Sequence, residues 1–323
     1  LSIEKGVIDK KDGQGSKTLS EKRFYFMRTN LDCFPCFLRQ ALEAARMVTQ
    51  NEGIQRKVLD SVFSILSNVS VHMTPVEIAH LVHLRVKSIT GDFDPYKEAK
   101  KKQNELALRY ESTLSAQIEE MSNPLKAAMM FSAAGNAIDL APNCPIPDIY
   151  KRYMEMISKG FAWDDYELFL KKVARSKSLL YLGDNAGEIV WDKILIEELV
   201  GTFSLDITYA VRGFPILNDV TMEDAHFVGL DKLVKVISNG FDAPGTLLER
   251  CSEEFLKRYN TSDLILSKGQ GNYESLSEEH HPIFFLLNVK CSVIAEDIHC
   301  NVGDLVLQAQ SNRVLFHHKH GYA

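Results

Sequence analysis

The spacing of apolar residues along the chain changes near residue 175. From Cys33 to about Lys172, apolar residues recur every three or four positions, which is typical of amphipathic helices. Stretches with Pro and Gly interrupt this period, and Thr74 and Asp94 can cap the helices that follow two of the breaks. We therefore predict a helical bundle domain over residues 27–175, in which the period is clearest in "CFLRQALEAARMV", "IQRKVLDSVFSIL", "NELALRYESTLSAQIEEM" and "YELFLKKVA".

Beyond Ser176 the chain alternates short apolar runs with helix-compatible segments. Runs with little polar alternation are typical of strands that are covered on both faces. Strands that alternate with helices predict a parallel, doubly wound, Rossmann-like sheet. We therefore predict an α/β domain over residues 176–312, with strands in "SLLYLGD", "LDITYAVRG", "LVKVISNG", "DLILSKGQG" and "IFFLLNV".

Two terminal stretches follow neither pattern. Residues 1–26 are polar and have no helical period, so we expect a flexible arm or an added extension outside the fold. Residues 313–323 form a tail whose histidines we expect to be exposed rather than metal ligands. Neither stretch enters the fold prediction.

Composition narrows the class of protein. The chain has 323 residues and 45% hydrophobic content, enough to build a sizeable core in one large or two moderate domains. The net charge of −6 and the lack of a basic stripe disfavour nucleic acid as a partner. No apolar run approaches the roughly 20 residues of a membrane span. Six scattered cysteines do not suggest a disulfide framework, so we expect a cytoplasmic protein with a small-molecule partner.

Polar and charged residues follow the predicted strands. In a parallel sheet these positions meet at one edge, where ligands bind. Asp184, Asn185 and Asp219 offer hard oxygen ligands that suit Mg²⁺ or Mn²⁺ better than zinc. A phosphate group could be held by cations and bare backbone N–H groups from the remaining strand ends. These are Arg212, Lys268, Gly269, Gln270, Gly271 and Asn272.

Each of these features also has a structural reading. An Asp-Asn pair after a strand is usually a turn or a helix cap, and "KGQG" alone is usually a tight turn. Several strand ends with complementary metal and phosphate chemistry favour a site. The "GDNAGE" turn lacks both the dinucleotide fingerprint and the phosphate-loop motif, which disfavours nucleotide cofactors.

Six segments, in this order, resemble the metal-dependent damage-control phosphatases, a family that also carries the description of an acidic-residue methyltransferase-like metal-binding domain. The resemblance covers nearly the whole chain from Asp32 to about Gln310. Cys33 and Cys36 are similar to the CxxC pair of one subfamily. The segments are "DCFPC" (32–36), "DPYKEAKKKQN" (94–104), "AAGNAIDL" (133–140), "LGDNAGE" (182–188), "VRGFPILNDVTMEDA" (211–225) and "SKGQGNYE" (267–274).

The resemblance implies a phosphatase that hydrolyses small phosphomonoesters such as sugar phosphates, phosphopantetheine-like compounds or damaged phosphometabolites. It implies one divalent ion, Mg²⁺ or Mn²⁺ with Co²⁺ or Ni²⁺ as alternatives, held by Asp184, Asn185 and Asp219. Lys268 would bind the phosphate, and Asn136 and Asp139 would reach the cleft from the helical half. Further expected site residues are Glu188, Arg212, Asp224 and Asn272, although Glu188 also fits a first-turn helix acid and Asp224 a solvated helix residue.

For the mechanism we favour metal-assisted transfer to water, with Asp184, Asp219, Lys268 and Asp139 as catalytic residues. Attack by the Asp184 carboxylate itself is the alternative. Two other functions stay open: a carboxyl methyltransferase that uses S-adenosylmethionine, and a non-catalytic redox or scaffold protein built on Cys33 and Cys36. The role of that pair and the oligomeric state also stay open.

Overall fold

A computed structural model describes residues 27–70, 72–135 and 146–312. Asn136 and Asp139 lie outside the described residues, as do the terminal stretches 1–26 and 313–323. The predictions made for these positions therefore stay predictions.

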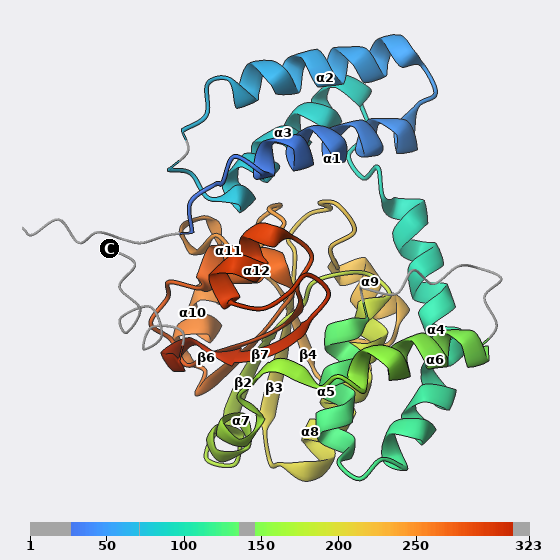
Figure 1. Cartoon of the computed structure of the whole chain (residues 1–323), viewed down its shortest axis with the longest axis vertical. Coiled ribbons are helices and arrows are strands. Elements are labelled where there is room, and N and C mark those ends of the chain that lie inside the picture. The colour runs from blue at the N-terminus through green and yellow to red at the C-terminus, as the bar shows by residue number, and fades with distance from the viewer. Residues whose placement is uncertain (1–26, 71, 136–145, 313–323) are drawn as a thin grey trace, which may run out of the picture.

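The described residues form a seven-stranded sheet in the order β1-β7-β6-β5-β2-β3-β4 (Figure 1). Five of these strands run parallel, in the order β6-β5-β2-β3-β4. The chain builds outward from β2 in one direction and then returns to build outward from β5, so β2 and β5 flank the topological switch point. The strands are β1 (Phe161–Asp164), β2 (Ser178–Leu182), β3 (Asp206–Val211), β4 (Lys235–Ser238), β5 (Leu264–Lys268), β6 (Ile283–Asn288) and β7 (Leu305–Ala309).

The predicted parallel, doubly wound sheet is confirmed for all five predicted strands. Strands β1 and β7 were not predicted. Strand β7 pairs antiparallel with β6, and β1 pairs parallel with β7, so both run against the other five. The four residues of β1 lie inside the segment predicted to be helical, because so short a run shows no period that sequence could reveal.

Helices cover both faces of the sheet (Figure 1). Strand β2 shows why, because its side chains alternate: Leu179 and Tyr181 pack in one apolar cluster, and Leu180 and Leu182 in another. The first cluster includes α4 (Lys97–Glu119), α5 (Pro124–Ala134), α6 (Ile146–Ile157), α7 (Tyr166–Val173), α8 (Glu188–Thr202) and α9 (Met222–Phe227). The second includes α10 (Glu253–Thr261), α11 (Gln270–Leu276) and α12 (Ser292–Ile298).

Three N-terminal helices have an apolar core of their own. They are α1 (Cys33–Val48), α2 (Glu52–Leu66) and α3 (Pro75–Thr90), and we call them the three-helix cap. Figure 1 shows them beyond one end of the sheet, on the side of α11. Thr74 caps α3 through a reciprocal capping box with Glu77, as predicted. Asp94 does not cap α4, because the helix begins after Tyr96 and the Asp94 carboxylate pairs with Lys100 instead.

The helices of the first half thus belong to two groups. Helices α1–α3 pack on one another, whereas α4 and α5 share the core of the sheet through α8. The domain bounds 27–175 and 176–312 stay predictions; among the described helices of the first half, only α1–α3 form a bundle apart from the sheet. Helix α8 has apolar residues around its whole circumference because α4 and α5 cover the side that faces away from the strands.

Candidate active site

Two turns at the carboxyl edge of the sheet lie side by side. The turn after β2 carries Asp184 and Asn185, and the loop after β3 carries Asp219. A β-bridge joins Asn185 to Asp219, and the Val220 N–H donates to the Asp184 carbonyl over 2.9 Å. The structure thus brings together the three residues expected to bind metal, next to the switch point between β2 and β5.

The two carboxylates of these turns are buried close to each other. Asp184 is 6% exposed and Asp219 is 3% exposed. Burial raises the pKa of Asp184 to about 6, and the neighbouring charge of Asp219 adds to this effect. Burial also raises the pKa of Asp219, although Arg212 opposes the shift. Two buried carboxylates repel each other when both are charged. Binding of a proton or a cation between them relieves this repulsion.

Hydrogen-bond donors of the protein contact only some of the side-chain oxygens of Asp184, Asn185 and Asp219, which we call the oxygen set. The Asn185 Nδ2 atom donates to Asp184 Oδ2 and, over 3.4 Å, to Glu188. Arg212 Nε donates to Asp219 Oδ2 over 2.7 Å. None of the described residues donates to Oδ1 of Asp184, Asn185 or Asp219. Two carboxylate oxygens and one amide oxygen match the ligands that Mg²⁺ and Mn²⁺ take, so these residues fit a hard divalent ion.

The set contains only two acidic residues, Asp184 and Asp219, and no His, Cys or Glu ligand. Over residues 27–70, 72–135 and 146–312, no group of three or more His, Cys, Asp or Glu side chains is arranged to hold a metal. The third donor of the candidate site is an amide, and a hard ion completes its shell with water or substrate oxygens.

Arg212 lies beside these residues with one unused donor. Its Nη1 atom donates to Thr246 over 3.2 Å and to Asn272 over 3.1 Å. Its Nη2 atom is buried and has no partner among the described residues. A buried donor without a partner is costly and usually marks a place for a water or a ligand. Arg212 is therefore suited to bind an anion next to the two carboxylates.

The glycine-rich turn after β5 approaches the carboxylates closely. Gly269 has φ +79°, and a Cβ atom there would lie 2.0 Å from Asp184 Oδ2. The Asn272 side chain is occupied by hydrogen bonds within the protein. It donates to the Lys268 carbonyl over 2.8 Å and accepts from Thr246. Gln270 donates to Glu274 over 2.9 Å. The phosphate-binding roles predicted for Gly269, Gln270, Gly271 and Asn272 stay predictions.

The ammonium of Lys268, which the family resemblance expects to bind the phosphate, contacts three groups of the protein itself. The residue is fully buried, and its ammonium donates to the Ser132 carbonyl over 3.0 Å, to Asp192 over 2.6 Å and to Glu188. The two carboxylates raise the pKa of Lys268 against the opposing effect of burial, so the ammonium stays charged. Burial raises the pKa of Glu188 to about 7.

Asp192 is a site residue that the sequence analysis missed. It is fully buried in α8 and accepts hydrogen bonds from Tyr181 over 2.8 Å, Tyr209 over 2.8 Å and Ser132 over 2.7 Å. One signal for it existed: Asp192 lies four residues after Glu188, on the same face of the first turns of α8.

A second polar network fixes the turn after β2 from the side of α4. Asn104 accepts from the Gly187 N–H over 2.6 Å and donates to Asp224 over 2.9 Å. Lys100 pairs with Asp224 at 3.3 Å and with Asp94 at 3.4 Å. Asp224 also completes the capping box of α9, so it is a buried brace and not a solvated helix residue. The segment 94–104 thus holds both turns in register.

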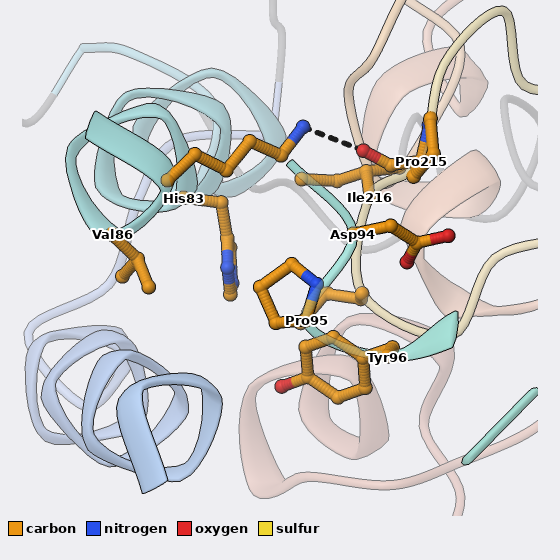
Figure 2. A pocket seen from close by; sticks show the side chains of 9 residues that line it. His83, Val86, Asp94, Pro95, Tyr96, Pro215 and Ile216 are labelled. Atoms are coloured by element: carbon orange, nitrogen blue, oxygen red, sulfur yellow. Dashed lines mark hydrogen bonds between the residues drawn. The ribbon is translucent and has the colours of Figure 1, made fainter. Parts of the chain in front are cut away.

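The three-helix cap contacts the loop that carries Asp219. Lys87 of α3 donates to the carbonyl of Pro215 over 2.6 Å, and the dashed line in Figure 2 marks this hydrogen bond. The same ammonium pairs with Asp242 at 3.2 Å. His83 faces a cavity of about 10 Å³ beside this contact, and burial lowers its pKa to about 3, so the ring is neutral. The cavity is large enough for no more than one water, and it is not a substrate site.

Two cysteine thiols accept hydrogen bonds from glutamine side chains. Cys36 accepts from Gln40 over 3.4 Å, and Cys291 accepts from Gln270 over 3.4 Å. Burial raises the pKa of Cys33 to about 11, and Glu274 and Cys291 add to this effect. Such a thiol stays protonated at neutral pH, which favours a packing role over a reactive one.

Comparison with known proteins decides the family. The family model described as the damage-control phosphatase ARMT1-like domain matches residues 29–306. The chain belongs to this family. A damage-control phosphatase of Pyrococcus horikoshii is 31% identical over 282 residues, which are 87% of this chain and 97% of that protein. A damage-control phosphatase of Archaeoglobus fulgidus is 34% identical over 280 residues, 85% of this chain and 96% of that protein.

Two further relatives extend the comparison. An uncharacterized protein of Methanocaldococcus jannaschii is 37% identical over 289 residues, covering 85% of this chain and 93% of that protein. The crystal structure of a DUF89 family protein from Pyrococcus horikoshii matches with a TM-score of 0.83 at 31% identity, covering 88% of this chain and 99% of that one. The family resemblance drawn from the sequence is thus confirmed, and phosphatase activity is supported at the level of the ARMT1-like family. No helix in the described part of the chain is both long and apolar enough to cross a membrane.

Proposed function

We propose that this ARMT1-like protein is a metal-dependent phosphatase that hydrolyses small phosphomonoesters by transfer to water. Asp184, Asn185 and Asp219 would hold the divalent ion through their free Oδ1 atoms. A divalent ion at this position supplies Lewis-acid neutralisation of phosphoryl charge. The choice of Mg²⁺ or Mn²⁺, with Co²⁺ or Ni²⁺ as alternatives, follows from the oxygen donors and the family.

The observation that carries the proposal is the pairing of Arg212 with Asp219. Arg212 binds this carboxylate through Nε, and its buried Nη2 is left without a partner in the described structure. An anion-binding donor therefore lies directly beside the oxygen set suited to a cation. Phosphoryl transfer requires these two elements together, since the enzyme contributes mainly position and charge.

Glu188 is placed to handle the proton of the attacking water. Lys268 donates to Glu188 Oε1, while Glu188 Oε2 accepts from Asn185 Nδ2 over 3.4 Å. Because the pKa of Glu188 is raised to about 7, its carboxylate can accept a proton near neutral pH. Glu188 fits this role better than Asp184, whose side chain belongs to the cation site.

The substrate proposed is a compact phosphorylated metabolite such as a sugar phosphate, a phosphopantetheine-like compound or a damaged phosphometabolite. Arg212 lies beside Asp219, and its Nη2 atom, which has no partner among the described residues, could contact a single phosphate group. The family match favours this function over a carboxyl methyltransferase and over a scaffold built on Cys33 and Cys36. A cytoplasmic location is proposed with it.

A phosphomonoester panel tests the function. We expect turnover of small sugar phosphates with Mg²⁺, Mn²⁺, Co²⁺ or Ni²⁺, and loss of that turnover after chelation, restored by adding one of the ions back. Phosphate release is the measurement, and phosphodiesters serve as the negative substrate class. The proposal is wrong if chelation leaves turnover unchanged, or if no phosphomonoester is cleaved with any of the ions.

Metal affinity should depend on pH. Because the metal-free protein holds a proton on Asp184 below its pKa of about 6, an ion must displace that proton to bind. We expect the dissociation constant for Mn²⁺ to rise at least about tenfold per pH unit below pH 6 and to level off above it. Calorimetry at pH 5, 6, 7 and 8 measures this, and a constant affinity across the range contradicts it.

A further inference from the structure

Lys268 has no N–H group to spare. An ammonium has three donors, and here they go to the Ser132 carbonyl, the Asp192 carboxylate and the Glu188 carboxylate. A phosphate oxygen can therefore bind Lys268 only by replacing one of these three partners. Which partner leaves decides how the lysine is positioned during the reaction.

Asp192 is the partner least able to leave. Its Oδ1 atom accepts from Tyr181, Ser132 and Lys268, and its Oδ2 atom accepts from Tyr209. The residue is 0% exposed, and Lys268 is the cation that contacts it. Separating a buried ion pair leaves an uncompensated charge and is strongly unfavourable. The stacked rings of Tyr181 and Tyr209 fix the two hydroxyls at this carboxylate.

The Ser132 carbonyl is also a fixed partner. Ser132 lies in the last turn of α5, where backbone carbonyls lack a complete set of helical donors. A lysine ammonium at this position satisfies the carbonyl and interacts favourably with the negative end of the helix dipole.

Glu188 differs from the other two partners. Its remaining oxygen accepts one long contact of 3.4 Å from Asn185 and has no hydroxyl donors like those around Asp192. It begins α8 next to the proposed cation site, so it lies between Lys268 and the reacting group. Glu188 is therefore the partner that an incoming anion can replace.

We propose that Asp192 is a positioning residue, which with the Ser132 carbonyl keeps Lys268 in place while its third N–H exchanges Glu188 for a phosphoryl oxygen of the substrate. This inference rests on the proposed phosphatase function. The exchange leaves Glu188 free of its lysine partner at the moment when substrate binds. Asp192 itself touches neither the substrate nor the ion.

A double-mutant cycle tests the inference, with Asp192→Asn, Lys268→Met and the double variant. We expect Asp192→Asn to lower kcat/KM about 100-fold and to weaken orthophosphate binding about tenfold, because a displaced donor loses much of its effect. Mn²⁺ affinity, measured by calorimetry without phosphate, should change less than about threefold. The double variant should be no less active than Lys268→Met, since Asp192 acts through the lysine.

Stability separates positioning from a general structural role. Lys268→Met leaves Asp192 buried without its cation, whereas the double variant removes both charges and should unfold at higher denaturant. Restored stability without restored activity supports the proposal. Additive losses of activity, or equal losses of phosphate and Mn²⁺ affinity in Asp192→Asn, overturn it.

A milder variant covers the case in which Lys268→Met does not fold. Tyr209→Phe removes one hydroxyl donor to Asp192 and keeps the ring. It should weaken orthophosphate binding about threefold with unchanged Mn²⁺ affinity; an unchanged phosphate affinity counts against the proposal. Full activity in Asp192→Asn would overturn only the positioning role of Asp192. If the wild-type protein shows no turnover but Asp192→Asn still weakens orthophosphate binding, only the phosphatase function is overturned.

Discussion

Asp184→Asn is expected to abolish phosphatase turnover and at the same time to stabilise the metal-free protein. The amide removes one charge from the oxygen set for the divalent ion, and we expect turnover to fall by roughly 10³-fold or more. The stability gain has a separate cause. Asp184 has a pKa of about 6 when folded, against 3.8 as the ordinary value. At pH 7 the folded state therefore carries a buried charge that costs on the order of 2–3 kcal/mol.

The sign follows from protonation. Because the folded pKa is raised, the folded chain binds more protons than the unfolded chain between pH 3.8 and about 6, so stability falls as pH rises through this window. Denaturant unfolding with a chelator at pH 7 measures the gain. Asp165→Asn is the matched control, because Asp165 accepts from Ala309 and Asn312 after β1, at the opposite edge of the sheet. Turnover above a tenth of the wild-type rate in Asp184→Asn would contradict the assignment.

Gly269→Ala is expected to reduce turnover about 100-fold or more, since a shift of about 1 Å in a reacting geometry costs this much. A Cβ atom at this position would meet Asp184 Oδ2 at 2.0 Å and Asp184 Oδ1 at 2.7 Å, so the carboxylate must move away from its place beside Asp219. Mn²⁺ affinity should fall with turnover, because the same carboxylate belongs to the proposed cation site.

Gly160→Ala provides the control for backbone strain. Gly160 has φ +70° against +79° at Gly269, but no atom lies within 4 Å of the position its Cβ would take. Both substitutions should destabilise the fold by about 1 kcal/mol through the left-handed backbone. Only Gly269→Ala should also lose activity and Mn²⁺ affinity. Equal activity in the two variants would show that Asp184 does not need its present position.

The parallel part of the fold could be predicted because β2, β3, β5 and β6 are largely buried and form apolar runs, and only the edge strand β4 is partly exposed. Strands β1 and β7 could not, for two physical reasons. Residues Phe161–Asp164 are too few to show a period. Strand direction is also not a local property, so the antiparallel pairing of β6 with β7 leaves no trace in either segment.

The part of the candidate site that lies at the carboxyl ends of the strands could be predicted from the sequence. Asp184, Asn185, Asp219 and Arg212 each follow a strand, and the topology alone brings them together. The direction of a side chain does not follow from its position after a strand, so the buried partners of Lys268 could not be predicted. Its partners lie 76 and more residues away in the chain, and only tertiary packing brings them into contact.

Asp192 was missed for a related reason. It lies within a helix, and two of its hydroxyl partners come from strands whose tyrosines look like ordinary core residues in the sequence. Asn104 and Lys100 lie in segment 94–104, which resembles the family, but the resemblance implied no role for either residue. Their contacts with Gly187 and Asp224 show that they brace two turns instead of meeting a ligand.

The three-helix cap has its own apolar interior, and the Lys87 side chain reaches the Asp219 loop through the backbone oxygen of Pro215. Every residue has a backbone carbonyl, so this hydrogen bond places little demand on which amino acid stands in place of Pro215. Natural variation or laboratory evolution can therefore rebuild the interior of the cap while the hydrogen bond to the Asp219 loop is kept.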